Sequence, residues 1–277
     1  MSSSVDMSEP LLDVRGLGVD YRGVRALGEV SFQIYAGETL GLVGESGSGK
    51  STLARAVLRL IRASRGQVFW RGMDLLRCDA ATLRSQRREL QIVFQDPLTS
   101  LNPRMTVAGT LAEPLLIFER DLTAGDRHMR MGRMLERVGL AESMLGRYPH
   151  ELSGGQCQRV AIARAMMLHP KLLICDEPVS SLDVSIQGQI VNLLSDLQSE
   201  FGTAMLFISH NLAVVRHISH RVAVIHDGNL IETASCEALF AAPVHPYTRA
   251  LLEAVLVPIS VPVPVCAAPD PTGRGRV

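Results

Sequence analysis

The chain has 277 residues, of which 47% are hydrophobic and 4% aromatic, and it carries equal numbers of basic and acidic residues, 28 of each. A core this poor in aromatic side chains has to be aliphatic, as in parallel strands covered by helices, which favours an α/β protein. The balanced charge gives no basic field for a nucleic acid or an anionic membrane surface, so we expect no nucleic-acid partner.

The cysteines and the apolar segments indicate the cellular setting. Five cysteines are scattered without a CxxC pair or a zinc-type spacing, which predicts reduced thiols in a cytosolic protein. No run of 18 or more apolar residues is present, and the start MSSSVDMSEP lacks the basic and apolar regions of a signal peptide. Any membrane role is therefore expected to come through partner chains.

The first half of the chain is predicted to begin with a small antiparallel layer. Residues 11–21 and 26–35 alternate apolar with polar side chains, as half-buried strands do. The run TLGLVG then indicates a buried strand, followed by a glycine-rich turn and a helix in STLARAVLRL. Two short strands are expected in GQVFW and LQIVFQ, and residues 105–167 have a mostly helical pattern, with Pro114 and Pro149 as interruptions.

The second half alternates strands with helices. Strands are predicted in KLLICDE, AMLFISH and RVAVIHDG, and helices in SIQGQIVNLLSDLQSEF and LAVVRHI. This order is typical of βαβ units in a mainly parallel sheet. After Leu256 the sequence is dense in Pro and Gly, which predicts a flexible, extended tail over residues 257–277.

Residues 44–52 read GESGSGKST and match the phosphate-loop pattern G-x-x-x-x-G-K-[ST] between a predicted strand and a predicted helix. Glycines let the backbone turn its N–H groups onto a phosphate, and the helix points its positive end at the same oxygens. We expect Lys50 to bind the β- and γ-phosphates of a nucleotide and the Ser51 hydroxyl to ligate Mg²⁺. The predicted nucleotide-binding residues of this loop are Gly44, Glu45, Ser46, Gly47, Ser48, Gly49, Lys50, Ser51 and Thr52.

A pair of carboxylates follows the later strand in LLICDEP. The strand delivers Asp176 and Glu177 to its carboxyl end, where open α/β sheets bind their ligands, and the two side chains point to opposite sides. Asp176 is predicted to ligate Mg²⁺ together with Ser51, and Glu177 to polarise the attacking water. An isolated DE pair is usually surface charge, but here it complements the phosphate loop.

At Leu152 to Gln156 the chain reads LSGGQ, followed by CQRVAIARAMMLHPKLLICDE, and this string resembles the signature region of the ABC ATPase family. The resemblance covers about residues 11–256. It implies a P-loop NTPase fold with a mixed central sheet, an N-terminal antiparallel β layer and a helical subdomain inserted at about 97–167. One departure is Cys157, where many family members carry a polar or basic residue; we interpret it as a packing residue.

The signature residues open a helix, which creates a second anion-binding N-terminus in a chain with one phosphate loop. In the ABC family, two subunits form a head-to-tail sandwich in which the signature of one closes on the ATP bound to the other. The resemblance therefore implies that ATP is bound in part by Ser153, Gly154, Gly155 and Gln156, and that Asp183 of the segment SSLD helps to align the two copies.

Three further roles follow from the same resemblance. Gln95 of VFQDP is expected to sense Mg²⁺ and the attacking water and to report to the membrane subunits, and His210 of LFISH to contact the γ-phosphate. Tyr21 resembles the aromatic residue that stacks on adenine. An ordinary strand residue remains the alternative for Tyr21, because aromatic side chains favour strands in any case.

Two segments, QDPLTSLNPRMTV and HPYTRALL, resemble the ATPase subunits of oligopeptide, dipeptide and nickel importers. The resemblance implies an ATP-hydrolysing motor subunit that uses ATP and Mg²⁺ at the cytoplasmic face of the inner membrane. Its implied partners are a second ATPase subunit, identical or paralogous, two transmembrane permease subunits and, indirectly, an extracytoplasmic solute-binding protein.

Peptides are the expected solute, and an importer of nickel or a metal chelate, or an exporter ATPase, are the open alternatives. Many members of that importer subfamily end in a cysteine-rich stretch that can hold an iron–sulfur cluster, but here only Cys266 lies in the tail, so no cluster is expected. A DNA-maintenance ATPase would need a long coiled coil, and a translation-type ABC protein would need two phosphate loops, so the sequence excludes both.

Overall fold

The computed structural model describes residues 9–21 and 23–256. The predicted tail, residues 257–277, lies outside the described residues. Within the described ranges, no helix combines the length and the apolarity needed to cross a membrane.

The N-terminal layer is a four-stranded antiparallel sheet in the order β2-β1-β4-β5. Strand β1 carries two runs of three buried residues and pairs with β2 on one side and β4 on the other, with Val14 opposite both Phe32 and Val68. Since one face of the layer is apolar, it packs against the rest of the molecule. Its strands are β1 (Leu12–Tyr21), β2 (Val24–Ile34), β4 (Arg65–Trp70) and β5 (Met73–Asp74).

The central sheet has six strands in the order β10-β9-β3-β8-β7-β6. All neighbours from β9 to β6 pair in parallel, and only the edge strand β10 runs antiparallel to its neighbour, so the sheet is mixed. The strands are β3 (Thr39–Val43), β6 (Leu90–Val93), β7 (Leu172–Asp176), β8 (Ala204–Ile208), β9 (Arg221–His226) and β10 (Asn229–Ser235).

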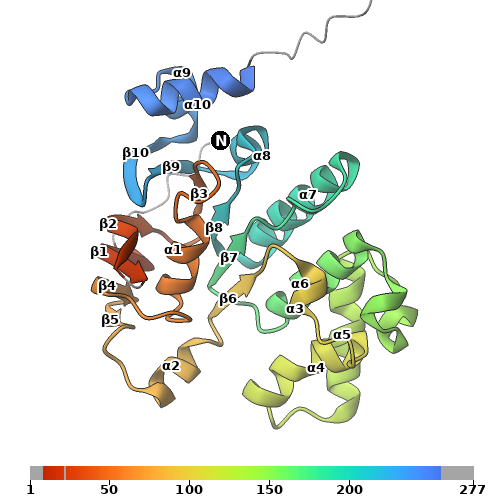
Figure 1. Cartoon of the computed structure of the whole chain (residues 1–277). Coiled ribbons are helices and arrows are strands. Elements are labelled where there is room, and N and C mark those ends of the chain that lie inside the picture. The colour runs from red at the N-terminus through yellow and green to blue at the C-terminus, as the bar shows by residue number, and fades with distance from the viewer. Residues whose placement is uncertain (1–8, 22, 257–277) are drawn as a thin grey trace, which may run out of the picture.

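Helices cover the central sheet and fill the chain between β6 and β7, where they form the yellow and green group on the right of Figure 1. The α-helices are α1 (Lys50–Val57), α2 (Ala80–Gln86), α3 (Pro97–Ser100), α4 (Val107–Phe118), α5 (Ala124–Arg137), α6 (Gly154–Met166), α7 (Val184–Phe201), α8 (Leu212–Ile218), α9 (Cys236–Ala241) and α10 (Pro246–Leu256). Two 3₁₀ helices precede α6, η1 (Glu142–Gly146) and η2 (Pro149–Glu151).

The prediction that Pro114 interrupts the helical region is wrong, because Pro114 lies inside α4. A proline there removes one helical hydrogen bond and crowds the preceding turn. The buried side of α4, which includes Leu111, Pro114 and Leu115, keeps the helix continuous by packing against the core. Pro149, the second predicted interruption, does mark a break, since η2 begins with it.

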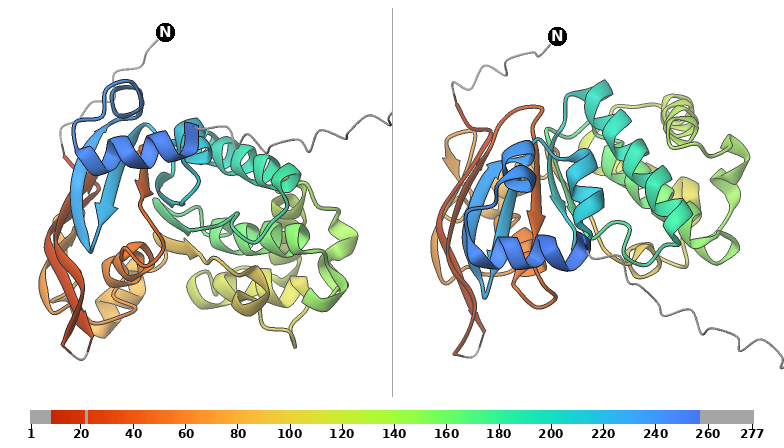
Figure 2. Two further views of the ribbon diagram at one scale, coloured as in Figure 1. Left: turned by 45° about the horizontal axis from the view of Figure 1, so that its top comes forward. Right: turned by 90° about the horizontal axis from the view of Figure 1, so that it is seen from above.

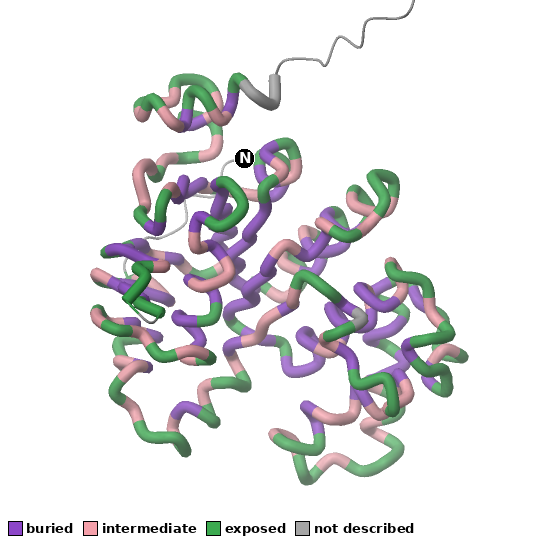
Figure 3. The backbone as a smooth tube through the Cα atoms, viewed as in Figure 1, coloured by how far each residue is buried: buried purple, intermediate pink, exposed green. Residues whose placement is uncertain are grey.

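The two faces of the central sheet carry separate apolar cores, visible as the buried centre of Figure 3. Strand β7 illustrates the division. Leu172 and Ile174 face the N-terminal layer and α1, whereas Leu173 and Cys175 face the helices on the other side. The alternation continues at the end of the strand, so Asp176 lies on the side of α1.

The carboxyl ends of β3, β7 and β8 lie side by side, since Val43 pairs with Val224 of β9, Leu42 with Ile208, and Ile208 with Asp176. Parallel strands therefore bring the phosphate loop after β3, the acidic pair at the end of β7 and His210 after β8 to one edge. Helix α10 crosses the molecule near the segment that joins β3 to α1 in both views of Figure 2.

Candidate active site

The phosphate loop connects β3 to α1, as the sequence predicts, and it is held between two strands. Gly49 has φ 101°, a conformation that strongly favours glycine, and a Cβ atom there would lie 2.8 Å from the carbonyl oxygen of Ala26 in β2. A Cβ atom at Gly44 would lie 2.2 Å from the carbonyl oxygen of Ile225 in β9. Larger residues at these two positions would push the loop off its strands.

Lys50, the first residue of α1, is 4% exposed, and its ammonium group is directed into the loop. Nζ donates to the carbonyl oxygens of Gly44, at 2.9 Å, and Glu45, at 2.6 Å. Burial lowers the pKa of Lys50, while the negative charges of Glu177 and Asp176 oppose that shift. A poorly hydrated cation at the first turn of a helix is suited to binding a phosphate.

A second feature of the loop also fits an anion with acceptor oxygens. The side-chain oxygen of Ser48 is buried and makes no hydrogen bond with the described residues. Its hydroxyl proton is therefore available to a ligand in the loop.

Ser51 and Asp176 form the second part of the site. The Ser51 hydroxyl donates a 2.8 Å hydrogen bond to Oδ1 of Asp176, which joins the first turn of α1 to the end of β7. Asp176 is 1% exposed, and burial raises its pKa, although the hydrogen bond from Ser51 opposes the shift. This pair of oxygens matches the donors that Mg²⁺ takes from a protein when a nucleotide supplies the others.

The carboxylate of Glu177 is the centre of a group that we call the Glu177 cluster, formed with Lys50, Gln95 and His210. Oε2 lies 3.2 Å from Nδ1 of His210 and 3.5 Å from Nε2 of Gln95. Oε1 lies 3.9 Å from Nζ of Lys50. The structure therefore brings the three predicted catalytic residues and the loop lysine to one point.

Backbone geometry fixes Glu177 in the cluster. Its φ is 50°, a sparsely populated conformation for a side chain of this size that costs on the order of 1–3 kcal/mol. Its N–H donates to the carbonyl oxygen of Ile208, at 3.0 Å, so the residue is tied to the end of β8. Only Ser209 separates Ile208 from His210, which explains how the side chains of Glu177 and His210 meet.

The predicted signature opens α6 and is ordered by a capping box. The Ser153 hydroxyl accepts from the Gln156 N–H, and the Gln156 side chain accepts from the Ser153 N–H. A Cβ atom at Gly155 would lie 3.0 Å from the side chain of Ile186 in α7, so α6 and α7 are in close contact at their first turns. Asp183 is the exposed N-cap residue of α7.

The signature does not meet the phosphate loop of its own chain. Across residues 9–21 and 23–256, no hydrogen bond or ion pair joins residues 153–156 to residues 44–52. The start of α6 is instead open to solvent, since Ser153 and Gly154 are exposed.

Tyr21 ends β1 and is 48% exposed. It lines a shallow hollow together with Arg62 and Ser64, and no described hydrogen bond or ring contact joins its side chain to the phosphate loop. By contrast, Tyr247 of α10, which is absent from the predicted site residues, contacts the loop: the Glu45 N–H points at its hydroxyl, with an N···O distance of 3.4 Å. Tyr247 lies in the segment HPYTRALL, which resembles importer ATPase subunits but does not by itself indicate a contact with the phosphate loop.

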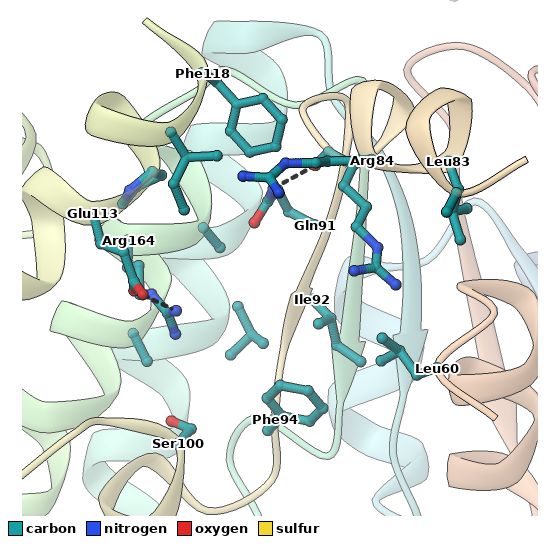
Figure 4. Close-up of a pocket in the computed structure, with 17 residues that line it drawn as sticks. Leu60, Leu83, Arg84, Gln91, Ile92, Phe94, Ser100, Glu113, Phe118 and Arg164 are labelled. Carbon is teal, nitrogen blue, oxygen red and sulfur yellow. Dashed lines mark hydrogen bonds and ion pairs between the residues drawn. The ribbon is translucent and has the colours of Figure 1, made fainter. Parts of the chain in front are cut away.

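A cavity of about 590 Å³ lies between the core and the helical segment. Figure 4 shows Ile92 and Phe94 of the β6 region on one side and Phe118 and the Glu113–Arg164 ion pair on the other. Arg84 and Arg87 of the α2 region also line it. Phe94, which lines this groove, directly precedes Gln95 of the Glu177 cluster in the sequence.

The sequence and the fold match known proteins. Residues 27–180 match the family model for the ABC transporter. The chain is 49% identical over 263 residues to the oligopeptide transport ATP-binding protein OppF of Haemophilus influenzae, covering 90% of this chain and 79% of that protein. It is 51% identical over 235 residues to OppF of Escherichia coli, covering 85% and 70%.

Among solved structures, the dimeric post-hydrolysis state of the ATP-binding cassette MJ0796 bound to ADP and Pi is similar, with a TM-score of 0.75 and 28% sequence identity. The match covers 81% of this chain and 98% of that one. The P-loop fold with a mixed sheet and an antiparallel layer is therefore confirmed. On these matches, the chain belongs to the ABC transporter family of ATPases.

Proposed function

We propose that this chain is the ATP-hydrolysing motor subunit of a peptide importer, at the cytoplasmic face of the inner membrane. Support for the solute comes from the relatives named oligopeptide transport ATP-binding proteins, which are about half identical over most of the chain. Support for the chemistry comes from one observation above all, the Glu177 cluster at the mouth of the phosphate loop.

In the proposed reaction, the N–H groups of residues 44–52 and the Lys50 ammonium hold the phosphates. Glu177 accepts the proton of the attacking water through Oε2, the oxygen that faces Gln95 and His210. Gln95 would orient the water, and His210 would contact the γ-phosphate. Tyr21 stacks on the adenine ring.

Ser51 and Asp176 are proposed to hold Mg²⁺, with Gln95 as a further oxygen ligand. Protein sites for this ion commonly provide only one or two side-chain oxygens and leave the remaining positions to phosphate and water. The bound ion would neutralise charge on the β- and γ-phosphates. The 2.8 Å hydrogen bond between Ser51 and Asp176 keeps both oxygens on the same side of the loop.

The proposed active unit is a dimer with a second ATPase subunit. No described hydrogen bond joins residues 153–156 to the phosphate loop of their own chain, and Ser153 and Gly154 are exposed, which supports closure on a partner's ATP. Asp183 lies at the start of α7, beside the first turn of α6, and is placed at the same interface. The unit spans residues 11–256, with residues 97–167 as its helical subdomain.

The groove between β6 and α4 is proposed to receive a helix of a permease subunit. Its apolar floor suits an amphipathic helix, and Arg84 and Arg87 favour acidic side chains at the helix edge. A helix in this groove would press on Phe94 and so bias the position of Gln95. Charge reversal at Arg84 and Arg87 should weaken co-purification with the permeases and leave ATP binding by the isolated subunit unchanged.

Uptake measurements in cells test the proposal. Deletion of the gene should abolish uptake of labelled di- or oligopeptides, and the wild-type gene should restore it, whereas a Glu177→Gln gene should not. Normal peptide uptake with a loss of nickel uptake would show that the transported solute is nickel or a metal chelate and not a peptide. A defect in drug efflux without any uptake defect would favour an exporter and would refute import.

A further inference from the structure

The C-terminal helix α10 reaches the phosphate loop through one side chain. The backbone N–H of Glu45 is directed at the hydroxyl oxygen of Tyr247, with an N···O distance of 3.4 Å, although the two residues are 202 positions apart. The carbonyl oxygen of Glu45 accepts the 2.6 Å hydrogen bond from Nζ of Lys50. Tyr247 and Lys50 therefore hold the two ends of one residue in the loop.

The ring of Tyr247 is held against the same edge of the central sheet. It stacks on the ring of His226, with centroids 4.0 Å apart and planes at 28°. His226 is the last residue of β9, whose neighbour β3 leads directly into the phosphate loop. Because stacking fixes the plane of the ring, it also fixes the place of the hydroxyl.

The start of α10 is anchored independently of the loop. The carboxylate of Glu232 in β10 accepts from the N–H groups of Val244, at 2.8 Å, and His245, at 2.9 Å. Nδ1 of His245 in turn accepts from the N–H of Tyr247, at 3.1 Å. Since β10 pairs with β9, the backbone and the ring of Tyr247 are both attached to the sheet.

Burial raises the pKa of Tyr247, and the negative charge of Glu45 adds to that shift, so the hydroxyl keeps its proton at neutral pH. It is thus a neutral group that can accept from the Glu45 N–H without adding negative charge beside the phosphates.

From these contacts we propose that Tyr247 is a positioning residue for nucleotide binding: its hydroxyl holds Glu45, and with it the loop carbonyl that Lys50 contacts. The inference rests on the proposed function, since it assigns a role in ATP binding. The residue touches the loop and takes no part in bond breaking. Loss of the hydroxyl should therefore weaken ATP binding and leave the rate at saturating ATP unchanged.

Tyr247→Phe tests this inference, because it removes the hydroxyl and keeps the ring that stacks on His226. The KM for ATP should rise about three- to tenfold, as for the loss of one uncharged hydrogen bond, while kcat and the thermal midpoint stay at the wild-type values. Tyr35→Phe is the matched control, since the Tyr35 hydroxyl donates a 3.0 Å hydrogen bond to Gln33 in the antiparallel layer. Its KM should not change.

A second variant keeps the test decisive if Tyr247→Phe folds poorly. Glu232→Ala releases the start of α10 and should also raise the KM for ATP. The KM of the double variant Tyr247→Phe/Glu232→Ala should not exceed the higher KM of the two single variants, because both substitutions act through one contact. A wild-type KM in a folded Tyr247→Phe variant would overturn the inference, and if that variant does not fold, a wild-type KM in Glu232→Ala would do so. Lys50→Ala in the same assay separates the two proposals. If Lys50→Ala retains ATPase activity, the proposed function is refuted. If Lys50→Ala loses activity while Tyr247→Phe keeps the wild-type KM, only the role of Tyr247 is refuted.

Discussion

The hydroxyl of Ser51 lies 2.8 Å from Oδ1 of Asp176, a residue 125 positions further along the chain. This hydrogen bond joins the first turn of α1 to the end of β7 and places the phosphate loop against the acidic pair. The next residue, Glu177, has a positive φ that interrupts the strand alternation, so its carboxylate does not point to the opposite side as predicted but also meets Lys50, together with Gln95 and His210. In the proposed function, Asp176 therefore serves nucleotide binding and its neighbour Glu177 serves hydrolysis.

Lys50→Ala should lower the affinity for ATP by a factor of about 100 or more, because it removes a charge-assisted contact with clustered phosphate oxygens. Titration of the purified subunit with ATP by calorimetry measures the effect. Lys171→Ala is the matched control, since Lys171 is an exposed lysine outside the loop. Equal affinities in Lys50→Ala and the wild type would contradict the assignment of the loop.

Asp176→Asn should make the protein more stable in the absence of nucleotide at pH 7.5. Burial raises the pKa of Asp176, so the folded state holds its proton more tightly than the unfolded chain does, and stability is lost as pH rises from the ordinary Asp range to the raised pKa. Asparagine removes this penalty. The thermal midpoint should rise by about 2–4 °C for each kcal/mol recovered.

The pH dependence distinguishes this cause from others. The difference in thermal midpoint between Asp176→Asn and the wild type should shrink as the pH is lowered towards about 4, where about half of the aspartate in the unfolded chain is protonated as well. Asp196→Asn, at an exposed position of α7, should leave the midpoint unchanged. A lower midpoint for Asp176→Asn at pH 7.5 would show that the buried charge is stabilising.

The buried cysteines should resist alkylation. Burial raises the pKa of both Cys157 and Cys175, and both side chains are 0% exposed, so little thiolate forms and the reagent cannot reach it. In native protein at pH 8, iodoacetamide should label these two residues at least roughly tenfold more slowly than the half-buried Cys78, as followed by peptide mass spectrometry. Labelling of Cys157 at the rate of Cys78 would mean that α6 opens readily.

Features that are encoded in one short segment, or in the order of the parallel strands, could be predicted from the sequence. The phosphate loop could be predicted because strand, glycines, lysine and helix are contiguous, and the pairing of Ser51 with Asp176 because parallel strands end at one edge. The packing role predicted for Cys157 also agrees with its burial in the core. In each case a short segment carries its own physical signal.

Contacts between distant segments could not be predicted in this way. Nothing in the local sequence of Tyr247 indicates that its hydroxyl meets Glu45, because that contact depends on how β10 turns back along β9. The positive φ of Glu177 is likewise set by its hydrogen bond to Ile208 of the neighbouring strand. Pro114 was misjudged for the same reason, since tertiary packing outweighed its local preference.

The central claim is that Glu177 drives hydrolysis in a dimer closed by the partner's signature. Glu177→Gln keeps the size and the hydrogen-bonding capacity of the side chain and removes its negative charge. Lys50, Ser51 and Asp176 remain to hold the nucleotide, so ATP should still bind and the closed dimer should accumulate. Ser153→Arg places a bulky side chain at the start of α6 and should prevent that dimer from forming. Glu237→Gln, exposed on α9, serves as the control for loss of a carboxylate.

Size-exclusion chromatography of purified Glu177→Gln with and without ATP, combined with its rate of phosphate release, tests this claim most directly. We expect phosphate release to fall by roughly 10² or more, as for the loss of a positioned general base, and the protein to elute as a dimer only with ATP and only with an intact Ser153. Near-normal turnover in Glu177→Gln, or a monomer that retains ATP, would contradict the account.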